Sequence, residues 1–224
     1  SARRSPGGRP ATPAGPAHQA IKAPLEAAAG RLAQRKQQAA ADLKALYDVY
    51  SGEERRQMAS PRYLPALGQS LSKWEAIAIA LNTGNEASRR RLTDSRIEGA
   101  LDEAGLAAVL ASLDARDAGF VQSVWDYLAA FEPDITAREK RVSGIEPQWV
   151  QPISLTIAGK ALKGGYYPLA YDGVDTAPDL AQSLLSGRFA RSQTEAGHGR
   201  SRVDLTARPL DLDIAVLHRH VNRL

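Results

Sequence analysis

One segment of this 224-residue chain departs from the helical pattern that fills most of the rest. Between residues 153 and 157, apolar and hydroxyl side chains alternate, which is typical of a half-buried β-strand. After a turn at 158–160, residues 161–171 would return as a second strand that contains the run Gly164-Gly165-Tyr166-Tyr167-Pro168. A double glycine in a strand indicates a bulge or a close backbone approach. The sequence predicts one β-hairpin, which must pack on helices or on a neighbouring chain because an isolated hairpin is marginally stable.

Helical periodicity and cap residues account for most of the other segments. Ser72 and Glu75 have capping-box spacing, and Asp114 begins the clearest helix, in which apolar residues recur at positions i, i+3, i+4 and i+7. Pro24 suits a first helical turn, and Asp134 and Gly144 are the expected start and end of one further helix. The predicted helices cover residues 24–50, 74–82, 85–91, two short stretches of 94–113, 114–132, 134–142, 176–187 and 213–224.

The predicted fold class is therefore mainly α, an irregular helical array with one β-hairpin near 153–171 and an extended N-terminal arm. Residues 1–23 are expected to be a disordered or extended basic arm, because seven of the first sixteen residues are Pro or Gly. Residues 24–150 form the predicted helical domain and 151–172 the hairpin. Residues 173–224 are expected to hold a helix, an Arg-rich loop and a C-terminal helix.

The composition excludes several classes of protein. The chain has no Cys, which rules out disulfides, thiolate metal sites and a cysteine nucleophile. It has no run of about 18 apolar residues, so no membrane-spanning segment is expected. The Arg-, Pro- and Gly-rich start lacks the apolar region of a secretory signal. The first residue, Ser1, and the last, Leu224, favour a segment of something larger.

The net charge of +4 is unevenly distributed. Residues 1–40 carry +6 and residues 186–224 carry +3, so residues 41–185 carry −5. Basic ends are typical of arms that contact phosphate or an acidic partner, although solvated tails have the same composition. Aromatic residues are sparse among these cations, so any contact with double-stranded DNA would be sequence-independent. The candidate DNA contacts are Arg3, Arg4, Arg9, Arg188, Arg191, Arg200 and Arg202.

No catalytic motif accompanies these features. The chain lacks H-E-x-x-H, the glycine-rich phosphate loops and the G-x-S-x-G elbow. His218 and His220 are two residues apart, so they do not share a helical face for joint metal ligation. We expect no catalytic, cofactor-binding or metal-binding residues and a chain that is not an enzyme. One of the two adjacent tyrosines is expected to pack on the core and the other to face a partner; the candidate partner-interface residues are Tyr166, Tyr167, Trp125, His218 and Leu224.

Several motifs together resemble a helical block of the giant polyvalent polypeptides of phages and mobile elements, among them phage internal virion proteins. The similarity covers roughly residues 70–224. It is carried by Ala80-Leu81-Asn82-Thr83-Gly84-Asn85-Glu86, Leu113-Asp114-Ala115-Arg116-Asp117, Phe120-Val121-Gln122-Ser123-Val124-Trp125-Asp126, Glu139-Lys140-Arg141-Val142-Ser143-Gly144-Ile145-Glu146-Pro147, Gly164-Gly165-Tyr166-Tyr167-Pro168-Leu169 and Arg208-Pro209-Leu210-Asp211-Leu212-Asp213.

The resemblance implies a structural segment of a virion protein that is ejected with the genome. It implies partners that are copies of the chain or sister virion proteins, and a location in the virion, in the host cytoplasm during assembly and at the host cell envelope on ejection. No catalytic residue carries over from it, and no cofactor is implied. Two alternatives stay open: a sequence-independent DNA-binding module of a mobile-element protein, and a fragment that adjoins an enzyme domain elsewhere in the parent chain.

Overall fold

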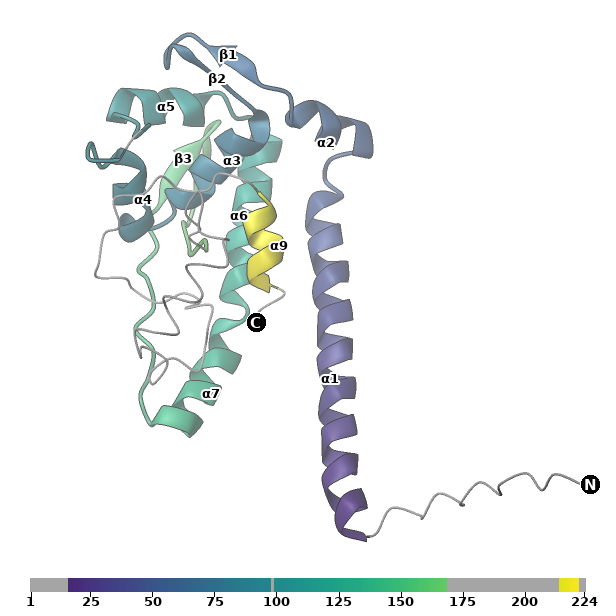
Figure 1. The fold of residues 1–224 in the computed structure, drawn as a ribbon. Helices are drawn as coiled ribbons and strands as arrows, with labels where there is room; N and C mark the ends of the chain where they lie inside the picture. The colour runs from purple at the N-terminus through teal and green to yellow at the C-terminus, as the bar shows by residue number, and fades with distance from the viewer. Residues whose placement is uncertain (1–15, 98, 169–213, 222–224) are drawn as a thin grey trace, which may run out of the picture. The chain divides into compact units, whose positions relative to one another are not determined.

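A computed structural model describes residues 16–97, 99–168 and 214–221 of the chain. The protein is mainly helical, as the sequence predicts (Figure 1). It divides into two units, Ser1–Asp42 and Leu43–Leu224. Most of helix α1 belongs to the first unit, whereas the core and all the strands of the described residues belong to the second.

Helix α1 runs from Pro16 to Tyr47 and is longer than predicted. Its first helical position is Pro16, where a missing N–H costs nothing, so residues 16–23 are helical rather than part of an extended arm. Pro24 lies inside the helix and removes one backbone hydrogen bond. The neighbouring alanines have the highest helix propensity of any residue and continue the helix on both sides. The arm prediction for residues 1–15 lies outside the described residues.

After α1, a short helix and a hairpin lead to the core. Helix α2 spans Gly52–Met58, and strands β1 (Arg62–Leu64) and β2 (Gln69–Leu71) pair antiparallel with Tyr63 opposite Ser70. This second hairpin was not predicted from the sequence, because its strands are only three residues long and Pro61 and Pro65 flank β1. Neither proline falls within a strand, so both are compatible with the ladder. The turn is closed at Gly68, which has a left-handed φ of 64°.

Helix α3 (Lys73–Asn82) is the centre of the core. It buries every residue from Ala76 to Asn82 and packs against α4, α5 and α6. Its predicted capping box is confirmed: Ser72 Oγ accepts from the Glu75 N–H, and the Glu75 carboxylate accepts from the Ser72 N–H at 2.7 Å. Helix α4 (Glu86–Thr93) follows after one turn, with Asn85 as its N-cap. The short loop between α3 and α4 becomes the contact point for a distant segment described below.

The segment 94–113 contains one helix, α5 (Glu103–Ala111), and not the two that were predicted. Asp94 adopts an extended conformation that ends α4. The backbone then forms turns until the Leu101 N–H donates to the Leu92 carbonyl at 2.8 Å. Gly99 has a φ of 76°, a left-handed conformation that a helix does not tolerate. These turns return the chain to the side of α3 on which α5 packs.

Helix α6 (Ala115–Ala129) forms as predicted, with Asp114 as its N-cap and its apolar face fully buried through Val121, Val124, Trp125 and Leu128. Helix α7 (Glu132–Ser143) begins earlier than predicted. Pro133 lies in its first turn, and Phe131 occupies the cap position without a side-chain hydrogen bond. Asp134 is therefore a first-turn residue and not the cap. The predicted end is confirmed, because Gly144 closes α7 with a φ of 70°.

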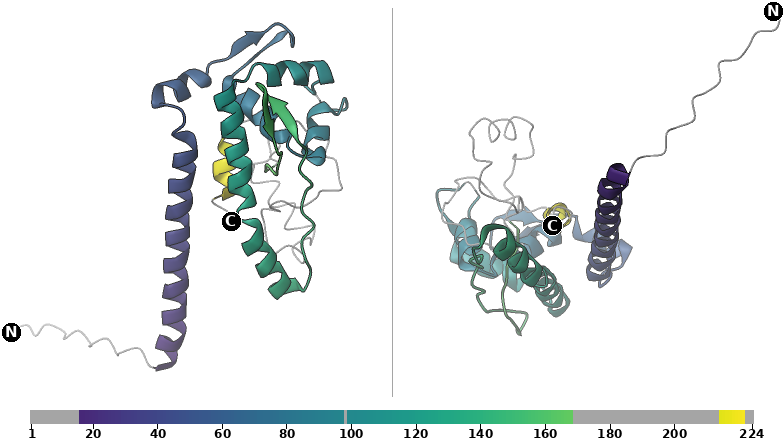
Figure 2. Two further views of the ribbon diagram at one scale, coloured as in Figure 1. Left: turned by 180° about the vertical axis from the view of Figure 1, so that it is seen from behind. Right: turned by 90° about the horizontal axis from the view of Figure 1, so that it is seen from below.

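The predicted hairpin exists but is shorter than expected. Strands β3 (Leu155–Ile157) and β4 (Lys160–Leu162) pair antiparallel with Ile157 opposite Lys160, and β4 packs on α6 (Figure 2). The turn residues Ala158 and Gly159 both have positive φ, 50° and 74°. Residues 163–168 leave the strand, and the reason lies in their contacts with α3 and α6.

The last described element is helix α9 (Ala215–Val221), which buries Val216, Leu217 and Val221. It confirms a C-terminal helix within the predicted range 213–224. The helix predicted at 176–187, the Arg-rich loop and the cap residue Asp213 lie outside the described residues.

Candidate functional site

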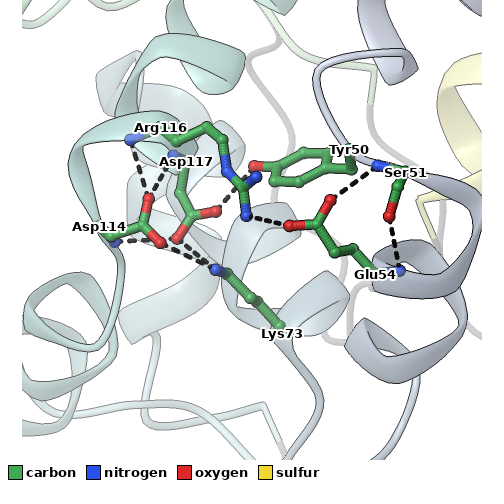
Figure 3. A network of polar contacts seen from close by, with 7 residues as sticks. All are labelled: Tyr50, Ser51, Glu54, Lys73, Asp114, Arg116 and Asp117. Carbon is green, nitrogen blue, oxygen red and sulfur yellow. Dashed lines mark hydrogen bonds and ion pairs between the residues drawn. The ribbon is translucent and has the colours of Figure 1, made fainter.

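The most connected polar cluster of the described residues surrounds the buried carboxylate of Asp117, at the start of α6 (Figure 3). Asp117 Oδ1 accepts a hydrogen bond from the Tyr50 hydroxyl at 2.7 Å. Asp117 Oδ2 accepts from the Asp114 N–H at 2.9 Å and lies 2.9 Å from Lys73 Nζ. Both oxygens of a fully buried carboxylate are thus satisfied by donors from three places in the chain. We call Tyr50, Lys73, Asp114 and Asp117 the carboxylate clamp.

Local sequence explains how each group reaches the clamp. Asp114 is the N-cap of α6 and accepts from the Asp117 N–H, so cap and clamp share one reciprocal box. The start of α6 also carries the positive end of the helix dipole, which favours a carboxylate there. Lys73 opens α3, and its Nζ bridges Asp117 to Asp114, from which it is 3.1 Å away. Tyr50 follows the end of α1 and is 1% exposed.

A second layer covers the clamp from the side of α2. The Arg116 guanidinium lies 4.9 Å above the ring centroid of Tyr50 and pairs with Glu54 at 2.8 Å. The Glu54 carboxylate also accepts from the Ser51 N–H at 2.7 Å, as half of the capping box that starts α2. The caps of α2 and α6 are thereby joined through one ion pair. This layer is half-exposed, so we expect its contribution to stability to be small.

The electrostatics of the clamp oppose acid–base chemistry. Burial, together with the hydrogen bond to Asp117, raises the pKa of Tyr50 far above its usual value. Burial lowers the pKa of Lys73, but hydrogen bonds to Asp117 and Asp114 outweigh it and raise the pKa overall. Burial raises the pKa of Asp114, but hydrogen bonds from the Asp117 N–H and from Lys73 outweigh burial and lower the pKa overall. All three shifts move away from neutral pH, whereas general acid–base catalysis needs pKa values near it. The arrangement suits a structural lock.

A second constellation explains the double glycine. The Gly84 carbonyl, in the loop between α3 and α4, accepts from the Ile153 N–H at 2.9 Å and from the Gly165 N–H at 2.8 Å. Asn85 Nδ2 donates to the Gly165 carbonyl at 3.1 Å. A Cβ on Gly165 would lie 2.7 Å from Cβ of Trp125, and one on Gly84 would meet the same indole ring. The predicted close backbone approach is confirmed. We call Gly84, Asn85, Trp125, Gly164 and Gly165 the glycine knot.

The glycine knot also corrects part of the hairpin prediction. Gly164 has a φ of 78°, and a Cβ at this position would collide with the backbone of Ile153 and Gly84, so the chain turns away from β4 at a point that only glycine fits. The two tyrosines that follow do not alternate between a core and a partner. Tyr166 is 7% exposed and Tyr167 is 1% exposed, so both are buried.

The structure places the other predicted site residues as follows. Trp125 is 1% exposed and donates its indole N–H to the Leu81 carbonyl at 3.1 Å, so, like the two tyrosines, it packs inside the protein. His218 is exposed and its ring lies 5.1 Å from that of Tyr47. His220, which was not singled out as an interface residue, is buried 5.7 Å from the ring of Tyr166. Leu224 and the seven candidate DNA-contact arginines lie outside the described residues.

The arginine triplet of α4 is engaged within the protein. Arg91 is buried and donates to the Ala87 carbonyl. Arg89 pairs with Glu103 at 2.6 Å, and Arg90 pairs with Glu86 at 2.7 Å. These cations are therefore partly neutralised by their neighbours. Among the described residues, no group of three or more His, Asp or Glu side chains is arranged to hold a metal ion.

Sequence reasoning did not identify the clamp as a site. Asp114 was predicted only as the start of a helix, and neither Tyr50 nor Lys73 was a candidate site residue. The signal that was present is the acid at the third position after an N-cap acid, which predicts a capping box. The partner of Asp117 lies 67 positions earlier in the sequence, beyond the range of any local pattern.

Comparisons with known proteins add no relative: no family model, no curated protein and no solved structure matches this chain. In the described part of the chain, no helix is long and apolar enough to span a membrane.

Proposed function

We propose that the chain is a non-enzymatic assembly segment of a large phage internal virion protein that takes part in genome ejection into the host. The observation that carries the proposal is that the motifs on which the resemblance depends make the contacts between helices in this fold. The motif around Gly84 and Asn85 and the motif around Gly164 and Gly165 meet in the glycine knot. The motif that contains Asp114 and Asp117 forms the clamp. These residues stabilise the packing of the helices, which supports a structural role.

The first unit supports an assembly role independently of the motifs. Between residues 22 and 41 every side chain is exposed except that of Ala39, which is half-buried. A helix so exposed has side chains available for contact with copies of the chain or with sister virion proteins, the partners that the proposal names. In this proposal the protein is located in the virion and, during assembly, in the host cytoplasm.

Sedimentation velocity of the parent protein over a hundredfold range of concentration tests the proposal. We expect the parent to form larger species with itself or with co-expressed virion proteins of the same phage. Removal of residues 1–42 should reduce that association while the Trp fluorescence of the second unit stays unchanged. A parent protein that remains strictly monomeric, alone and in the mixture, would contradict an assembly role.

Sequence-independent DNA binding is a second candidate, and one observation favours it. The unit Ser1–Asp42 carries seven Lys and Arg residues against two acids, a net charge of +5. Clustered cations bind phosphate, and the affinity falls steeply with salt. Titration of the chain with duplex DNA at 50 and at 200 mM salt tests this candidate function. No detectable binding at 50 mM salt would exclude it.

A further inference from the structure

The exposed part of α1 carries an apolar stripe. Leu25 is 63% exposed and Leu32 is 54% exposed. The two leucines are seven residues apart and therefore share one face of the helix. Ala29 lies between them on that face, and Ala39 continues the seven-residue spacing. The small side chain of Ala29 between the leucines allows a second helix to approach closely. We call these four residues the leucine stripe.

The composition of α1 gives a physical reason for a covered stripe. Pro24 and Gly30 lie inside the helix, at costs of about 3 and about 1 kcal/mol relative to alanine. Helices in proteins draw most of their stability from packing of an apolar face and little from propensity alone. A helix that contains both residues, with its leucines in water, lacks that source of stability. A partner on the leucine stripe would supply it.

Charge identifies the chemistry of that partner. Arg35 and Lys36 follow Leu32 by three and four residues, so they lie on either side of Leu32, one turn further along the same face of the helix. Within the described part of the chain, neither cation forms an ion pair, nor does Arg31. The two acids of this helical stretch are already engaged: Glu26 lies 3.5 Å from Lys22, and Asp42 accepts from Gln38 at 2.7 Å.

We propose that residues 25–39 of α1 bind an acidic amphipathic helix of another polypeptide. Its apolar face covers Leu25 and Leu32, and carboxylates on both of its flanks pair with Arg35 and Lys36. This inference rests on the proposed assembly function and names the chemistry of the partner.

Other occupants fit less well. A second copy of α1 packed in parallel would bring Arg35 and Lys36 close to the same cations, which is unfavourable. An antiparallel copy would offer these cations only Glu26 and Asp42, which are already engaged. DNA would use the cations but leave the leucines in water. A membrane surface would find only two large apolar side chains on this stretch, Leu25 and Leu32, too few to insert a helix stably.

The test measures binding of the full 224-residue chain to two fluorescent 28-residue synthetic helices. Both peptides carry the same leucine and alanine stripe; one has Glu on both flanks and the other has Lys in the same places. We expect the Glu-flanked peptide to bind at least tenfold more tightly. The double substitution Arg35→Glu with Lys36→Glu should reverse the preference, and Leu32→Gln should weaken binding at least tenfold. Circular dichroism checks that α1 stays helical in each variant.

A matched control changes charge on the opposite face. Gln34→Glu with Gln37→Glu should leave the affinity for the Glu-flanked peptide within twofold of the original. Equal affinity for the two peptides, absence of binding, or a preference that the charge reversal fails to invert would overturn the proposal. A third measurement uses a 20-base-pair DNA duplex. If the Leu32→Gln variant binds this duplex with full affinity and the charge-reversed variant does not bind it, the ligand of α1 is nucleic acid and not an acidic helix.

The outcomes also separate this inference from the proposed function. If neither peptide binds but the parent still associates in sedimentation velocity, the acidic-helix partner is wrong and the assembly role stands. If the Glu-flanked peptide binds but the parent is strictly monomeric in every mixture, the stripe is a docking surface and the virion assembly role fails.

Discussion

Replacement of Asp117 by alanine tests whether the clamp locks the second unit together. The substitution removes the acceptor of the Tyr50 hydroxyl and of the Asp114 N–H and one of the two carboxylates that face Lys73. Asp117 is 0% exposed, so water does not replace these contacts without local opening.

The expected loss in the free energy of unfolding follows from the burial of Asp117 and from the number of hydrogen-bond donors left without an acceptor. Breaking a buried ion pair by removing one partner costs about 3–5 kcal/mol. Lys73 is partly exposed and keeps Asp114 as a second partner at 3.1 Å, which favours the lower end of that range. We therefore expect a loss of about 3 kcal/mol in the free energy of unfolding, out of the roughly 5–15 kcal/mol of an ordinary domain.

Urea unfolding followed by tryptophan fluorescence measures this loss. The three tryptophans, Trp74, Trp125 and Trp149, all lie in the second unit, so the signal reports on that unit alone. The matched control is Glu75→Ala. Glu75 occupies the same third position of a capping box, at the start of α3, but has no link to Tyr50. We expect it to cost about 0.5–2 kcal/mol, the range for loss of a cap. Equal losses for the two variants would refute the clamp.

Three further predictions concern the glycine knot, the second layer of Glu54 and Arg116 that covers the clamp, and α1. Gly165→Ala should lower the free energy of unfolding by about 1–3 kcal/mol, the usual cost of overpacking, because its Cβ would lie 2.7 Å from Cβ of Trp125; Gly119→Ala, which meets only the flexible end of a lysine, should not. Hydrogen bonds from Ser51 and Arg116 lower the pKa of Glu54 from 4.5 to about 2, so its stabilising effect is fully present above pH 4.5 and is lost as the pH falls toward 2. Glu54→Gln should therefore flatten the pH dependence of urea unfolding between those values, and an unchanged dependence would exclude this carboxylate as its source. Pro24→Ala should increase the helical circular dichroism of α1 without shifting the tryptophan-detected midpoint of the second unit, since it removes a cost of about 3 kcal/mol from the helix alone; a shifted midpoint would show that the two units unfold together.

Local sequence predicted those elements whose signals lie within a few residues of one another. The capping box at Ser72, the helix start at Asp114 and the helix end at Gly144 are confirmed because each depends on backbone geometry inside one turn. Pro24 was expected in a first helical turn but lies inside α1, and the predicted start of α7 at Asp134 was too late because Pro133 lies in its first turn. The strand after Lys160 was extended too far because its end is set by Gly84, some 80 residues earlier.

Periodicity and side chains that cap their own backbone predict the mainly helical class, the starts of α3, α4 and α6, and a hairpin near residue 155. The packing of the helices brings Tyr50 and Lys73 to Asp117, fits Gly165 against Trp125 and buries both tyrosines of the Gly-Gly-Tyr-Tyr-Pro run, and none of these could be predicted from local sequence. The physical reason is that burial and long-range hydrogen bonds depend on which helices meet, and no residue carries that information in its immediate neighbours.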